Sequence, residues 1–279
     1  MRSYFCGWYF RCQSGQQTLA IIPSVHKTKK SNFCAIQLIT DTESLHAEFH
    51  FSACQKYGDQ IAIAGNRFSK EGICLDIQTP NLCASGSMHF GPFTPIRYDI
   101  MGPFRFVPFM QCRHSVYSMC HRVDGEITVN GTQYLFRNAI GYIEGDQGHS
   151  FPKEYVWTQC SFPNGALMLS IADIPLGTLR FTGVIGIVYL NGKEYRLATY
   201  LGAKAVKISP DEIIVRQGKC VLTVKPQDIS GHPLQAPIAG AMSRTIYEHP
   251  SCKVKYRFAK SGITLLELDT QNAAFEYEY

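Results

Sequence analysis

The chain has 279 residues, which is enough for one large domain or for two domains of about 140 residues that each bury their own core. Hydrophobic residues make up 45% of it and charged residues only 18%, so disorder is excluded as the main state and an apolar interior cavity is expected. The net charge of +5 comes from scattered lysines and arginines, and its one short cluster, Lys27, Lys29 and Lys30, fits a solvated hairpin tip. Nucleic-acid binding is therefore not expected.

Strand signals dominate the chain. Short apolar runs rich in Val, Ile, Phe and Tyr alternate with turn residues, and long helical periodicity is scarce. The runs expected to form strands include, in chain order, His46 to Phe51, Gln60 to Ala64, Ile73 to Ile77, Phe104 to Phe109 and Ile213 to Val215. Two weak helix candidates are Ser209 to Gln217 and Gly240 to Glu248. The sequence therefore predicts an all-β fold with few short helices.

Three Asn-Gly pairs predict tight type I′ hairpin turns, because both residues tolerate a positive φ angle. They are Asn130-Gly131, Asn164-Gly165 and Asn191-Gly192. The segments 129–136 and 190–197 resemble each other around two of these pairs, which hints at two similar β units. Closed barrels remove exposed sheet edges, and two small barrels would account for a chain of this length.

The eleven cysteines predict a reduced protein. Their number is odd, no C-x-x-C pair occurs, and no signal peptide is recognisable at the start of the sequence, so free thiols and a cytoplasmic location are expected. The longest uncharged stretch, Ile77 to Ile96, contains three prolines and several polar residues, which makes it a poor membrane span. No transmembrane segment is expected.

The stretch from Gly141 to Pro152 is the most unusual in the chain. Glu144 and Asp146 are two residues apart, so both carboxylates share one face if the backbone is extended. Burial and mutual repulsion would then keep a proton on one of them, which is the arrangement of a general acid. Alternatively, both carboxylates accept backbone hydrogen bonds in a glycine-rich turn. The local sequence leaves both interpretations open.

The run after Pro152 alternates in a way that suits a pocket wall. Tyr155, Trp157 and Gln159 share one face of the expected strand, and aromatic side chains with one orienting polar group are typical of binding pockets. The alternative is that Tyr155 and Trp157 are ordinary core residues with a polar end.

The run from Cys112 to His121 contains residue types that bind metal ions. Cys112, His114 and Cys120 share a strand face, but residues 112 and 120 of an extended strand lie about 26 Å apart, which is too far for one zinc ion. We therefore expect no metal here, and Arg113, His114 and His121 are candidates for pocket residues. No nucleophile elbow, phosphate-binding loop or dinucleotide fingerprint is present, so no cofactor is expected.

The central motif resembles a known family. The matching residues are Gly141-Tyr142-Ile143-Glu144, Asp146, Gly148, Ser150-Phe151-Pro152, Trp157, Gln159, Gly7-Trp8-Tyr9-Phe10, Ile22-Pro23 and Phe275-Glu276. They are similar to the motifs of the tocopherol cyclase family, with departures at Gly145, Gln147 and His149, where Lys, Trp and Arg are usual. The segment from Trp157 to Gly165 is more distantly similar to the carotenoid hydratases, whose members pair two lipocalin-like barrels. This resemblance implies two lipocalin-like antiparallel β-barrel halves packed side by side, divided as 1–152 and 153–279.

The resemblance also implies chemistry. Such an enzyme protonates an isolated C=C bond of an apolar prenylated or polycyclic substrate, and a phenol oxygen or water traps the cation without a cofactor. The residues implied for catalysis are Asp146 as proton donor, Glu144 as its neighbour and His149 as a relay. The residues expected to bind the substrate are Trp8, Arg113, His114, His121, Tyr155, Trp157 and Gln159. The alternatives are a cytoplasmic binding protein for an apolar ligand and a structural module without catalytic activity.

Overall fold

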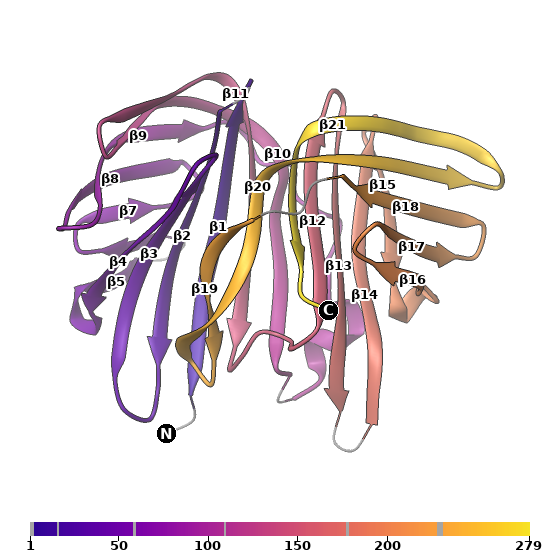
Figure 1. The fold of residues 1–279 in the computed structure, drawn as a ribbon, viewed down its shortest axis with the longest axis horizontal. Helices are drawn as coiled ribbons and strands as arrows, with labels where there is room; N and C mark the ends of the chain where they lie inside the picture. Colours follow the sequence, from indigo (N-terminus) through magenta and orange to yellow (C-terminus); the bar gives the residue numbers. More distant parts are fainter. Residues whose placement is uncertain (1–2, 16, 58–59, 109, 177–178, 228–230) are drawn as a thin grey trace. The chain divides into compact units, whose positions relative to one another are not determined.

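The computed structural model describes residues 3–15, 17–57, 60–108, 110–176, 179–227 and 231–279. Strands account for 74% of the chain and helix for 4%, and the strands form two large antiparallel sheets (Figure 1). The predicted all-β fold is therefore confirmed. In the described residues the helical segments are three short 3-10 turns, η1 (Phe51–Ala53), η2 (Gly102–Phe106) and η3 (Thr199–Leu201).

The chain divides into two compact units. Unit 1 contains residues 1–96, 112–151 and 235–244, and unit 2 contains residues 97–111, 152–234 and 245–279. The chain thus crosses between the units several times, and each unit takes in a short segment from a distant part of the sequence. The division into domains 1–152 and 153–279 stays a prediction.

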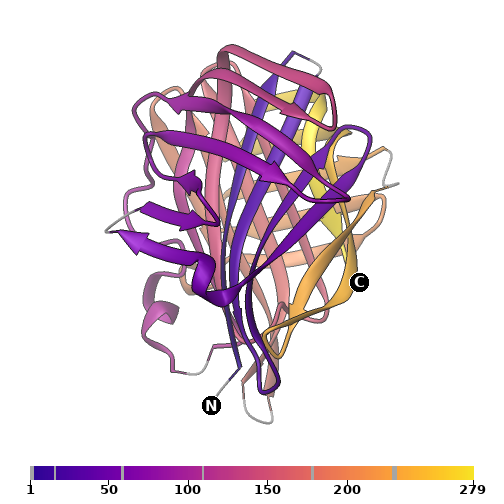
Figure 2. The ribbon, with the colours of Figure 1, turned by 90° about the vertical axis from the view of Figure 1, so that its left-hand side faces the viewer.

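Unit 1 is built on an eleven-stranded sheet that curls into a near-barrel. The short strands β6–β9 cross in front of the long strands β1–β3 (Figure 2). The order across the sheet is β4 (Ser44–His50), β3 (Asn32–Thr40), β2 (Gln17–Lys27), β1 (Tyr4–Ser14), β11 (Thr132–Gly148), β10 (Cys112–Val129), β9 (Cys83–Phe90), β8 (Gly72–Gln78), β7 (Asn66–Phe68), β6 (Gln60–Ile63) and β5 (Cys54–Tyr57).

The core of unit 1 fills the inside of this curled sheet. Strand β8 illustrates the pattern, because Ile73, Leu75 and Ile77 are buried while the residues between them are more exposed. Period-two alternation directs every second side chain to the same face, so apolar residues from all the strands meet there. The resulting cluster includes Phe10 of β1 and Ile143 of β11.

The second sheet forms most of unit 2. Its order is β15 (Lys193–Ala198), β14 (Leu179–Leu190), β13 (Gly165–Leu176), β12 (Tyr155–Phe162), β21 (Ile263–Tyr277), β20 (Ala241–Lys260), β18 (Cys220–Pro226), β17 (Glu212–Gln217) and β16 (Lys204–Ser209), with β19 (His232–Ile238) paired to β20. Its apolar cluster includes Val156, Leu169, Val188 and Phe258. The hairpin tip 235–244 between β19 and β20 belongs to unit 1.

A buried arginine fastens segment 97–111 within unit 2. Arg196 donates to the backbone oxygen atoms of Tyr98 and Asp99 at 2.8 and 3.0 Å, and it forms an ion pair with Glu194 at 2.9 Å. Both charged side chains are buried, and a buried pair is tolerated when further hydrogen bonds satisfy it. The segment is therefore held to β15 by polar contacts.

Two hairpin turns have the predicted form. Asn130-Gly131 joins β10 to β11 with φ angles of 46° and 86°, and Asn191-Gly192 joins β14 to β15 with φ angles of 50° and 76°. Positive φ at both central residues is the type I′ geometry that matches the twist of the flanking strands. The two similar segments 129–136 and 190–197 are thus both hairpins, one in each unit.

The third Asn-Gly pair lies one position away from the predicted turn. Phe162 pairs with Gly165, so the two central residues are Pro163 and Asn164, and Asn164 has a φ angle of 65°. Proline at the first central position and a positive φ at the second are typical of a type II turn. Gly165 already belongs to β13, where a Cβ atom would overlap the ring of Phe162.

The helix predictions were wrong. Segment Ser209 to Gln217 contains β17, and Gly240 to Glu248 contains the start of β20. In β17, Ile213 and Val215 are fully buried, and both pair with strand β18. β-branched side chains pack well on a pleated sheet, so tertiary pairing outweighs a weak helical pattern.

The strand predicted at Phe104 to Phe109 was also wrong. Residues Gly102–Phe106 form the 3-10 turn η2, and Phe109 lies outside the described residues. Pro103 stands in the first turn, where its fixed φ angle suits a helical start, and the ring of Phe104 packs edge-on against Tyr200 at 6.0 Å.

All eleven cysteines are free thiols, as predicted. In the described part of the chain, none of the helices has the length and apolar character needed to span a membrane.

Candidate functional site

Three strands of unit 1 position the central motif. Strand β11 lies between β1 and β10. Every second residue of β11 faces the same way, so Tyr142, Glu144 and Asp146 share one face. The register places Tyr9 of β1 opposite Glu144 and His114 of β10 opposite Asp146. Cross-strand partners share a face, so these side chains gather on the side of the sheet that points away from the apolar core of unit 1.

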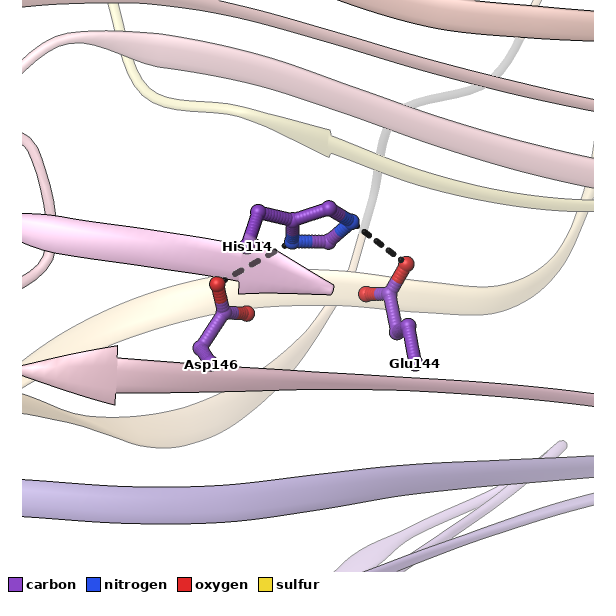
Figure 3. Close-up of side chains that lie close together, drawn as sticks. All are labelled: His114, Glu144 and Asp146. Carbon is purple, nitrogen blue, oxygen red and sulfur yellow. Dashed lines mark hydrogen bonds and ion pairs between the residues drawn. The ribbon is translucent and has the colours of Figure 1, made fainter. Parts of the chain in front are cut away.

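His114 lies between the two carboxylates (Figure 3). Its Nδ1 is 3.0 Å from Asp146 Oδ1, and its Nε2 is 3.2 Å from Glu144 Oε2. The first contact has hydrogen-bond geometry, whereas the second is an ion-pair contact without it. The two edges of one imidazole ring therefore face two different carboxylates, and we call this group the His114 cluster.

Two further side chains complete the His114 cluster. Tyr142 donates its hydroxyl to Glu144 Oε2 at 2.5 Å, and Cys112 donates its thiol to Asp146 Oδ1 at 3.4 Å. The Glu144 side chain is only 6% exposed, whereas that of Asp146 is 23% exposed. Asp146 is therefore the more accessible of the two carboxylates.

The environment favours a charged imidazole. Burial by itself lowers the pKa of His114, but the charges of Glu144 and Asp146 and the hydrogen bond with Asp146 outweigh it, so the pKa of His114 lies well above its ordinary value. Burial, reinforced by the same carboxylates, raises the pKa of Cys112 and of Tyr142 well above their ordinary values. The thiol and the phenol therefore keep their protons at neutral pH and act as hydrogen-bond donors, and the raised pKa of His114 favours the imidazolium.

The three residues His114, Glu144 and Asp146 are also of the types that bind metal ions. One ligand atom each of His114, Glu144 and Asp146 lies within 4.8 Å of the others, and this is the one such group in the part of the chain that the structure describes. The two carboxylates face different nitrogens of the ring, however, and one ion binds only one imidazole nitrogen. The arrangement fits a proton shared between charged groups better than a chelated metal.

β-bulges determine which residue faces the carboxylates. Counted without interruption from the turn Asn130-Gly131, the pairing of β10 and β11 would place Ser115 opposite Asp146. Register shifts between Val116 and His121, and again near Gly125, move the pairing by a net one residue, so that His114 takes this place. A shift of one residue moves a side chain to the other face of the sheet. Glu144, Asp146 and His114 are all candidates from the sequence, but no sequence signal predicts that they meet.

The other candidates on β10 lie elsewhere. His121 faces the inside of the barrel, where its ring lies 4.8 Å from both Phe90 and Phe93 and its Nδ1 lies 3.0 Å from Ser118 Oγ. Burial lowers the pKa of His121 to about 4, so this histidine is neutral. Arg113 pairs with Gln147 in the register and therefore lies on the opposite face from His114.

His149 does not join the cluster. It is exposed just after β11 ends, and its Nδ1 lies 3.3 Å from Ser150 Oγ. The structure thus brings together Glu144, Asp146 and His114, while the relay expected at His149 stays a prediction.

The aromatic candidates lie in both units. Trp8 lines a cavity inside unit 1. Tyr155, Trp157 and Gln159 are buried on β12 in unit 2, on the opposite face from the apolar cluster to which Val156 belongs. Tyr155 donates its hydroxyl to Glu276 at 2.5 Å. Their role in binding a substrate stays a prediction.

Solved structures share this fold. CghA superimposes with a TM-score of 0.64 at 8% identity, over 99% of this chain and 88% of CghA. Kievitone hydratase from Nectria haematococca does so with a TM-score of 0.56 at 9% identity, over 99% of this chain and 89% of the hydratase. At such identities the likeness defines the class by fold alone, that of the all-β two-barrel proteins.

The sequence comparisons define the family. A family model described as tocopherol cyclase-like matches residues 96–262, which is more than half of the chain and includes the whole His114 cluster. This protein belongs to the tocopherol cyclase-like family, as its motifs predicted. The "Probable tocopherol cyclase, chloroplastic" of Oryza sativa subsp. japonica is 29% identical over 129 residues, which span 43% of this chain and 27% of the rice protein.

Proposed function

We propose that this protein is an enzyme that closes a ring, or adds water, by protonating a C=C bond of an apolar substrate. The observation that carries the proposal is the buried imidazole of His114 between Glu144 and Asp146, which stores a proton beside a partly accessible carboxylate. Membership of the tocopherol cyclase-like family supports a substrate with a prenyl double bond next to a phenol.

The residues of the His114 cluster have distinct roles in this proposal. Asp146 delivers the proton to the alkene because it is the more exposed of the two carboxylates, and His114 supplies that proton through Nδ1. Glu144, held by Tyr142, keeps the imidazole charged and in place.

The proposed step balances without a cofactor. The proton held by His114 passes from Nδ1 to Asp146 Oδ1 and then to one alkene carbon, where it forms a C–H bond and leaves a cation at the other carbon. The oxygen of the phenol or of water forms a C–O bond to this cation, and the proton that this oxygen loses returns through the Asp146 carboxylate to His114. The product is an isomer of the substrate, or its hydrate when water traps the cation, so neither an oxidant nor a reductant is needed.

The test uses a prenylated hydroquinone as substrate in D₂O. We expect the product to be a chromanol that carries one carbon-bound deuterium, as detected by mass spectrometry. Asp146→Asn should lower the rate about 10²- to 10⁴-fold, because a general acid typically contributes this much. Asp76→Asn is the matched control, since Asp76 is an exposed carboxylate on β8 of the same unit, and its rate should not change.

Two results would overturn the proposal. One is turnover without deuterium in the product, and the other is a wild-type rate for Asp146→Asn. If the purified chain binds the hydroquinone but never converts it, the alternative of an apolar-ligand binding protein replaces the enzyme.

A further inference from the structure

Unit 1 contains a cavity that the proposed chemistry does not use. Its volume is about 370 Å³, within the range of small-molecule sites. The buried side chains of Phe10, Ile61, Phe68 and Ile143 form part of its lining. An apolar ligand is favoured in such a cavity, because its binding removes apolar surface of the ligand from water.

Two aromatic rings form a wall of the cavity. Trp8 and Tyr117 both line it, and both lie over Gly145 of β11. A Cβ atom at position 145 would lie 3.0 Å from Tyr117 Cε2 and 3.5 Å from Trp8 Cδ1, so glycine allows the rings to approach the strand. Tyr117 is 43% exposed, so this wall extends from the apolar core to the solvent.

Polar and cationic side chains mark the open end. Lys56, Gln60 and Lys70 line the cavity and are exposed, and Ser69 lines it and is half-buried. The two ammonium groups and the side-chain hydrogen-bond donors are suited to an anionic oxygen at the entrance. The cavity thus changes from an apolar end to a cationic end.

The cavity and the His114 cluster lie on opposite faces of one strand. Ile143 lines the cavity, and the next residue along β11, Glu144, belongs to the cluster. Because neighbouring residues of a strand point to opposite faces, a molecule inside the barrel cannot contact the Asp146 carboxylate across the sheet. The two sites are separate.

We propose that this cavity is a second binding site, which takes an amphipathic carboxylate with its apolar chain inside the barrel and its anionic end at Lys56 and Lys70. The aromatic wall and the buried aliphatic side chains select the apolar chain, and the two lysines select the charge. The site is independent of turnover at the His114 cluster.

The test uses Trp8 as a reporter. The chain has two tryptophans, so Trp157→Phe leaves Trp8 as the sole emitter. Dodecanoate, added below its micelle concentration, should change the Trp8 emission in a saturable way. Dodecan-1-ol should bind about 2- to 5-fold more weakly than dodecanoate, because it cannot form the exposed ion pair. Dodecyltrimethylammonium should bind more weakly than the alcohol, because its charge is repelled by the two lysines.

Variants locate the ligand. Ser69→Phe and Gln60→Phe each place a ring in the cavity and should weaken dodecanoate binding at least about tenfold if the chain occupies that volume. Lys56→Glu should remove the preference for carboxylate over alcohol, whereas Lys30→Glu in the hairpin between β2 and β3 should keep it. Asp146→Asn should bind dodecanoate like the parent protein, which separates this site from the proposed catalytic one.

Three results would overturn this inference. The first is that none of the three probes changes the Trp8 emission in a saturable way. The second is that Ser69→Phe and Gln60→Phe both bind dodecanoate with unchanged affinity although circular dichroism shows that they fold normally. The third is that dodecyltrimethylammonium and dodecanoate bind with equal affinity. Loss of dodecanoate binding in Asp146→Asn would also contradict a separate site.

Discussion

His114 and His121 lie on the same strand, β10, in opposite environments. His114 lies on the polar face between two carboxylates, and its pKa is raised well above the ordinary value in spite of burial. His121 lies on the inner face among phenylalanines, and burial lowers its pKa to about 4. The same strand therefore carries one histidine whose charged form is favoured and one whose neutral form is favoured. Both rings are buried, so the difference between their pKa values comes from the neighbouring side chains.

The largest expected effect comes from removing the charged histidine. His114→Leu leaves Glu144 and Asp146 without their shared cation, and breaking a buried ion pair typically costs about 3–5 kcal/mol of unfolding free energy. His121→Leu places an apolar side chain among apolar neighbours and should cost less than about 1.5 kcal/mol. Urea unfolding at pH 7 measures both values.

A neutral replacement checks the cause. His114→Gln keeps a polar side chain without the charge. The unfolding free energy that it loses should be closer to the loss in His114→Leu than to the loss in His121→Leu. Equal costs for His114→Leu and His121→Leu would refute the electrostatic difference between the two faces.

The pH dependence of stability separates the two histidines next. The pKa of His121 is about 6.5 in the unfolded chain and about 4 in the folded one, so between these values the unfolded chain binds an additional proton. Stability should therefore fall as the pH falls from 6.5 to 4, by up to roughly 3 kcal/mol from this residue. The pKa of His114 is raised on folding, so its stabilisation is complete below pH 6.5 and is lost as the pH rises through the raised value.

Comparing wild type with His121→Leu isolates this contribution. His26, whose pKa burial also lowers to about 4, is present in both proteins and cancels in the difference. Unfolding free energies measured at pH 7, 5.5 and 4.5 should show the advantage of the wild type shrinking by roughly 2–3 kcal/mol as the pH falls, so that His121→Leu becomes the more stable protein near pH 4.5. Parallel curves would show that His121 titrates normally in the folded state.

The smallest expected effect concerns Gly141, the residue opposite His121 on β11. A Cβ atom at this position would overlap His121 Nε2 and crowd Val123, so Gly141→Ala should cost about 1–3 kcal/mol. In a His121→Ala background the ring is absent, and the same change should cost clearly less. A double-mutant cycle measured by urea unfolding gives the coupling, and an additive result would contradict the contact.

Much of the fold could be predicted from local chemistry. The Asn130-Gly131 and Asn191-Gly192 turns formed as expected because a two-residue turn depends only on which φ angles its own residues tolerate. The helix predicted at Ser209 to Gln217 failed because the preference of that segment was weak and pairing of β17 with β18 decided its conformation. Local sequence signals therefore predicted the turns, whose geometry depends on their own residues, but not a segment whose conformation depends on pairing with another strand.

The candidate site divides in the same way. The sequence by itself determined that Glu144 and Asp146 share a face, because two residues is the repeat of a strand whatever lies beside it. Only the tertiary structure decided that His114 lies between them and that His121 does not. That choice depends on β-bulges that move the β10–β11 register by a net one residue, and a bulge arises from packing and pairing with neighbouring strands. The protonated state of His114 follows from this register, since the two carboxylates that raise its pKa lie 30 and 32 residues further along the chain.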